Sequence, residues 1–76
     1  MNPTERAKGL LTDEFFMSVV EKQRQMYLSN ILNSAEDDVD VRERTLLKLR
    51  ALNEFVASLE SIAKSGEIKE KRLKIF

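Results

Sequence analysis

Two long runs of helical periodicity, separated by one acidic break, are the strongest constraint on what this chain can fold into. The break spans residues 34–40, and apolar residues recur at helical spacing before it over 13–33 and after it over 41–65. Two helices of about 20 residues would each be about 30 Å long. Because only a short connection joins them, we expect an all-α fold built on an antiparallel two-helix hairpin.

A short helix is expected ahead of this hairpin, over residues 3–11. Asn2 can cap its start, Pro3 suits the first helical position, and Glu5 completes a capping box with Asn2. Thr12 offers a second N-cap. We therefore expect the first long helix to begin directly after it.

The helix after the acidic break has the more regular pattern. We expect Asp40 to cap its start and Gly66 to end it in the left-handed conformation of a C-terminal cap. Its apolar residues fit consecutive a and d positions of a heptad: Leu49, Leu52, Val56, Leu59 and Ala63. Beyond it lies a basic tail, residues 67–76, whose pattern is compatible with either a short helix or a strand.

The middle of the first long helix is polar, over residues 21–25. One interpretation is that this stretch is solvated where the hairpin bulges. The other is that it specifies the register of a helix bundle, as buried polar residues sometimes do. The sequence leaves both open.

The chain is too small to bury two wide apolar stripes by itself. It has 76 residues and no cysteine, so neither a disulfide nor a thiolate metal site can stabilise it. We expect a single domain over residues 1–76 that is completed by oligomerisation. The interface between copies is expected to use apolar residues of both long helices and of the tail. These are Phe16, Val20, Tyr27, Leu49, Leu52, Val56, Leu59, Leu73, Ile75 and Phe76.

The sequence offers little for catalytic chemistry. It has no histidine, which is the commonest general base, and its two glycines cannot form a glycine-rich phosphate loop. Asp37, Asp38 and Asp40 cluster in the break but lack the glycine and the final glutamate of a calcium loop. We therefore expect no enzyme, with no catalytic residue, no metal and no cofactor.

The charge balance disfavours nucleic acid as the main partner. Thirteen basic and 13 acidic residues leave a net charge of zero, so no field attracts phosphates. Arg42, Arg44, Lys48 and Arg50 nevertheless lie close together in the second long helix, and a small nucleic-acid-binding regulator remains an alternative. No apolar run is long enough to span a membrane, and the start lacks a signal-peptide pattern, so we expect a cytoplasmic protein.

The sequence also resembles small helical-hairpin proteins encoded by tailed bacteriophages, over most of residues 6–72. The matching pattern consists of Arg6-Ala7-Lys8, Leu10-Leu11, Phe15 or Phe16, the acidic turn running into Arg42-Glu43, Leu49, Ala51-Leu52, Leu59 and Gly66. The resemblance implies a virion-assembly or accessory factor, whose partners are itself or another viral or host protein, in the host cytoplasm or the virion. An inhibitor of a host protein is a further alternative.

Overall fold

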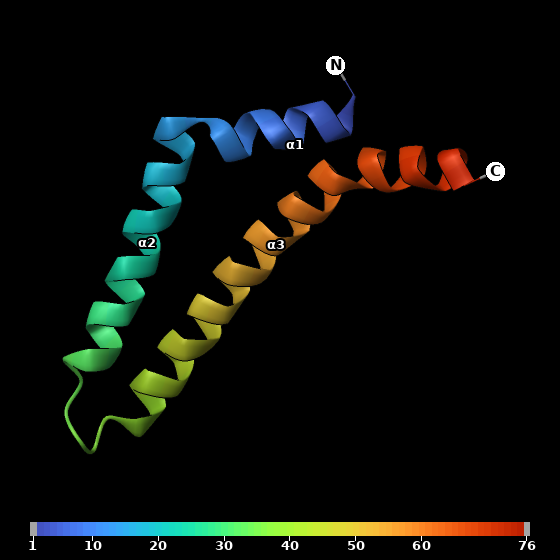
Figure 1. The fold of residues 1–76 in the computed structure, drawn as a ribbon. Helices are drawn as coiled ribbons and strands as arrows, with labels where there is room; N and C mark the ends of the chain where they lie inside the picture. The colour runs from blue at the N-terminus through green and yellow to red at the C-terminus, as the bar shows by residue number, and fades with distance from the viewer. Residues whose placement is uncertain (1, 76) are drawn as a thin grey trace.

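Three helices make up the described part of the chain (Figure 1). The computed structural model describes the backbone of residues 2–75 and the side chains of residues 2–65. The helices are α1 (Pro3–Thr12), α2 (Glu14–Leu32) and α3 (Val39–Ile75), and the backbone between residues 2 and 75 contains no strand. The expected all-α class is confirmed.

The start of α1 follows the predicted capping pattern. The side-chain oxygen of Asn2 accepts a hydrogen bond from the Glu5 N–H at 2.8 Å, and Pro3 occupies the first helical position. A donor that the helix itself cannot pair is thereby satisfied.

The start of α2 differs from the prediction by one residue. Asp13, rather than Thr12, is the N-cap, and its carboxylate accepts from the Phe16 N–H at 2.7 Å. Thr12 is instead the last residue of α1, where its hydroxyl donates to the Lys8 carbonyl at 2.9 Å. Because threonine hydroxyls readily bond back to the preceding turn, Thr12 ends one helix while Asp13 caps the next.

The start of α3 lies earlier than expected. The helix begins at Val39, and the Asp38 carbonyl accepts its first hydrogen bond from the Arg42 N–H at 3.0 Å. Asp40 therefore lies in the first turn, not at the cap. In that position its negative charge interacts favourably with the positive N-terminal end of the helix dipole.

The end of α3 corrects a second prediction. The helix continues through Gly66 to Ile75, and no glycine of the described backbone has a positive φ. A single glycine costs only about 1 kcal/mol in a helix relative to alanine. The sequence that follows is rich in Glu, Lys and Arg, which favour helix. The predicted helix end at Gly66 is therefore wrong.

The three helices are arranged like the sides of a triangle. In Figure 1, α1 lies along the top, α2 runs down from its end, and α3 returns upward to pass the start of α1. α1 contacts α3 more extensively than it contacts α2. The Thr4 and Ser65 hydroxyls form a hydrogen bond of 3.2 Å between α1 and α3. Ala7, only 3% exposed, is the most buried residue of α1, and its small side chain permits close approach of a neighbouring helix.

The interior of this arrangement is thin. Among the described side chains, the buried apolar residues are small or medium-sized: Ala7, Val20, Val56 and Ala63. The Cα atoms span 58 × 27 × 14 Å, and a depth of 14 Å accommodates one layer of helices. The radius of gyration is 17.1 Å, whereas a compact chain of this length would have about 11 Å. Both broad faces of the layer are therefore open.

The predicted heptad of α3 lies on its least exposed side. Val56 and Ala63 are buried, and Leu49, Leu52 and Leu59 are half-buried. Thr45 extends the same stripe by one heptad position and is also buried. Its hydroxyl donates to the Val41 carbonyl at 2.8 Å, so burial leaves no unpaired polar group there.

Candidate interaction surface

The residues predicted to form an interface lie mostly inside the chain. Those with described side chains are buried or half-buried: Phe16, Val20, Tyr27, Leu49, Leu52, Val56 and Leu59. The side chains of Leu73, Ile75 and Phe76 lie outside the described residues. The seven buried or half-buried residues lie where the helices of one chain face each other, and we call them the inner seam. A role for any of these residues between copies stays a prediction.

A second apolar set is exposed on the same helices. Phe15, Val19 and Met26 of α2 lie within about 40° of one another around the helix, and Phe55 and Ile62 of α3 are two turns apart. Their exposed fractions range from 41% at Ile62 to 79% at Phe15. We call these five residues the outer apolar face. In the sequence, the only signal for it was that the apolar stripes were wider than one partner helix requires.

The polar stretch of α2 joins this helix to α3. The Arg24 Nε donates to the Asn53 Oδ1 at 3.1 Å, across 29 residues of sequence. Arg24 also pairs with Glu21, which in addition accepts from the Gln25 amide at 3.0 Å. The Gln25 hydrogen bond lowers the pKa of Glu21 below its ordinary value; desolvation opposes this shift, and the hydrogen bond and positive charge of Arg24 add to it. Glu21, Lys22 and Gln25 are exposed, so this stretch is solvated, although the Arg24–Asn53 hydrogen bond links it to α3.

The Arg24–Asn53 hydrogen bond also defines how α2 is turned. Arg24 lies about 40° around α2 from the buried Val20 in one direction. Met26 lies about 120° from Val20 in the opposite direction. The α2 part of the outer apolar face therefore lies on the side of the seam away from Asn53.

The Arg24–Asn53 hydrogen bond also defines how α3 is turned about its axis. Asn53 lies about 60° around α3 from the buried Val56, and Phe55 lies about 100° from it in the opposite direction. Because Asn53 is bonded to Arg24, the two polar residues share one side of the α2–α3 pair. Phe55 and Met26 consequently share the other side. The outer apolar face is one surface contributed by two helices.

The acidic connection between α2 and α3 is closed by a basic residue. The Arg42 guanidinium donates to the Ala35 carbonyl and to the Glu36 carbonyl, the latter at 3.1 Å. The Asp38 N–H also donates to Ala35, at 3.0 Å. One of the four cations considered for nucleic-acid binding is thus engaged in holding the turn.

The remaining cations do not form a single patch. Arg44 and Lys48 lie one turn apart on α3, within about 40° of each other. Arg50 lies about 120° or more from either of them around the helix. All three are exposed. Their distribution is typical of a solvated helix and not of a phosphate-binding groove.

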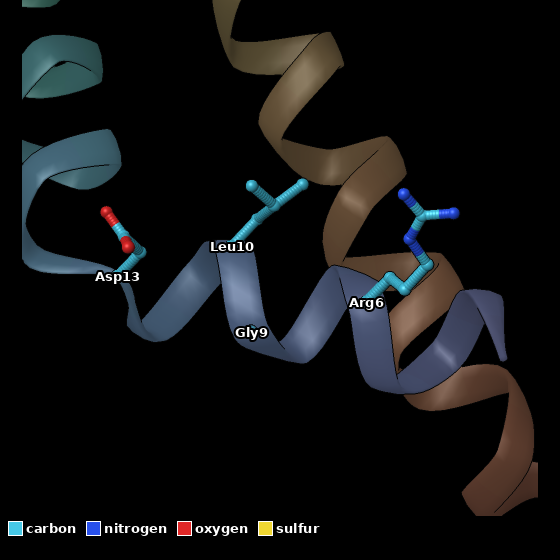
Figure 2. Close-up of a pocket in the computed structure, with 4 residues that line it drawn as sticks. All are labelled: Arg6, Gly9, Leu10 and Asp13. Carbon is cyan, nitrogen blue, oxygen red and sulfur yellow. The ribbon is translucent and has the colours of Figure 1, made fainter. Parts of the chain in front are cut away.

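A shallow hollow of about 330 Å³ lies at the corner between α1 and α2. It is lined by Arg6, Gly9, Leu10 and Asp13, and Figure 2 shows Arg6 and Leu10 on the same side of α1. A Cβ placed on Gly9 would meet no atom within 4 Å, so the space beside it is open. Asp13 is already occupied as the cap of α2. The hollow combines no nucleophile with a base.

The described residues offer neither a metal site nor a membrane-spanning helix. Within the side chains described, no group of three or more carboxylates could hold a metal ion. No helix in the described part of the chain is long and apolar enough to cross a membrane. Comparisons with family models, with curated proteins and with solved structures give no match to this chain. The outer apolar face is therefore the strongest candidate for a functional surface.

Proposed function

We propose that this protein is a non-enzymatic interaction module that acts by packing its helices against protein partners, of which another copy of itself is the first. In this proposal α2 and α3 form an antiparallel hairpin that oligomerisation completes. The protein contributes a shaped apolar surface, and no chemistry of its own.

The observation that carries this proposal is an apolar face left open on a single layer of helices. Helical domains are normally stable as two packed layers, because each apolar stripe must be covered. Contiguous exposed apolar patches on small proteins mark sites of interaction. Phe15, Val19 and Phe55 are each at least half exposed here.

For the biological setting, we propose virion assembly or an accessory role in a tailed bacteriophage. The support is the sequence resemblance over residues 6–72. A factor of this kind would act in the host cytoplasm or within the virion, on itself or on another viral or host protein.

Binding to nucleic acid is the weaker alternative. Arg42 is committed to the turn, and Arg50 points away from the pair formed by Arg44 and Lys48. With a net charge of zero, such binding would have to rely on two neighbouring cations.

Two measurements on the unmodified protein test the proposal. Light scattering over a micromolar concentration series is expected to give at least twice the chain mass of 8.8 kDa. Titration with DNA or RNA at low and at physiological salt is expected to give no specific binding. A folded monomer at all concentrations would contradict the self-association. A monomer that binds nucleic acid with a steep salt dependence would establish the alternative instead.

A further inference from the structure

The chain exposes more surface to solvent than a compact monomer of its mass would. A folded monomer of 8.8 kDa is expected to expose about 4,800 Å². This chain exposes 6361 Å², so the excess is about 1,600 Å². A standard interface takes about 800 Å² from each partner. Summed over the whole chain, this excess is larger than the area that one partner contributes to a standard interface.

The shape of the chain indicates what kind of partner fits. A flat layer with a depth of 14 Å is matched by a second flat layer, since stacking the two gives the two-layer packing that helical domains require. Another copy of the chain is such a layer. The zero net charge means that two copies do not repel each other overall.

The position of the apolar residues indicates which face is used. Asn53 on α3 is bonded to Arg24 on α2, so Phe55, two residues further along α3, is level with Lys22. Val19 and Met26 lie on either side of that level on α2. These apolar residues form the centre of the face, while the Arg24–Asn53 network occupies the opposite side.

We propose that a second copy of this chain binds the outer apolar face, with the same face of both copies in contact around a two-fold axis. This inference rests on the proposed function and specifies its surface. It assigns the contact to Phe15, Val19, Met26, Phe55 and Ile62, and not to the seam residues that the heptad pattern favoured. Lys22 borders the face, where its stem can cover apolar surface while its ammonium group stays in water.

A two-fold contact makes the proposal sensitive to single substitutions. A charge introduced on the face occurs in both copies, so two charges lose water and also repel each other. Val19→Glu and Phe55→Glu place such a charge on α2 and on α3, respectively. Leu46→Glu is a matched control, because Leu46 is 49% exposed but lies on the Asn53 side of α3.

Sedimentation velocity over a concentration series, with circular dichroism as the check of folding, tests this assignment. The unmodified protein and Leu46→Glu are expected to be dimers. Val19→Glu and Phe55→Glu are expected to dissociate with a dissociation constant weaker by roughly tenfold or more, at unchanged helicity. If a glutamate variant loses helicity, the uncharged Phe55→Gln replaces it, and weaker dimerisation is again expected.

Two outcomes would overturn the assignment alone. The first is dimerisation of Val19→Glu and Phe55→Glu as tight as that of the unmodified protein. The second is equal weakening by Leu46→Glu. In both cases the protein would still self-associate, as the proposed function requires, but through a different surface. An unmodified protein that is a folded monomer would overturn both.

Discussion

The inner seam and the outer apolar face are made of the same kinds of residue on the same two helices, yet they have different roles in the structure. Val56 is buried in the seam, while its neighbour Phe55 is about half exposed on the outer face. The larger and more apolar side chain is the one left in solvent. Both surfaces are therefore apolar, and a residue belongs to one or the other according to its angular position around the helix axis.

The two surfaces also differ in regularity. The seam of α3 keeps strict a and d spacing from Thr45 to Ala63. The outer face is a looser set, with three residues on α2 and two on α3. The residues of the regular heptad are thus the ones covered within this chain, and those of the less regular stripe stay exposed.

The largest effect should separate the neighbours Val56 and Phe55. Val56→Glu buries an unpaired charge and is expected to cost about 3 kcal/mol or more, which would largely unfold so small a protein. Phe55→Glu should change the stability of the monomer by less than about 1 kcal/mol. Urea unfolding at a protein concentration low enough to favour monomer measures both. Equal costs would show that the two surfaces are not distinct.

A smaller effect is expected from removing apolar volume. Leu52→Ala, in the half-buried seam, should cost about 2 kcal/mol, near the lower end for a leucine truncation. Leu47→Ala, at an exposed site of the same helix, should change stability by less than about 0.5 kcal/mol. Thermal unfolding of the two variants provides the comparison. A larger loss for Leu47→Ala would place the seam on another side of α3.

The third prediction concerns the junction of α1 and α2, where Asp13 caps the start of α2. Asp13→Ala should cost about 1 kcal/mol, because the Phe16 N–H loses its acceptor. Thr12→Ala should cost less than about 0.5 kcal/mol, since the hydroxyl only bonds back within α1. Chemical denaturation resolves the difference. The reverse order would restore Thr12 as the cap.

The smallest effect concerns the polar side of the layer. The pKa of Glu21 is expected below its ordinary value of 4.5, and Gln25→Ala should raise it because the largest stabilising hydrogen bond is lost. A lowered folded-state pKa adds stability above the ordinary value, and this stability is lost as the pH falls through the lowered one. NMR titration of the Glu21 carboxyl measures the shift. An unchanged pKa in Gln25→Ala would mean that this bond does not persist in solution.

Sequence patterns determined the features that depend on neighbours within a few residues. The Asn2 cap, the all-α class and the regular heptad spacing of α3 all follow from side chains one to four positions apart, which the sequence specifies whatever the rest of the chain does. The bounds of α1 and α2 lie within about one residue of those expected from these signals.

The tertiary structure decided everything that joins distant residues. The Thr4–Ser65 and Arg24–Asn53 hydrogen bonds connect positions 61 and 29 residues apart, and no local pattern indicated either of them. The same is true of Ala7, whose burial depends on where α1 crosses α3. The choice between two apolar stripes was also made at this level. Local periodicity places a residue on a face of its helix, but only the packing of a second helix determines whether that face is covered.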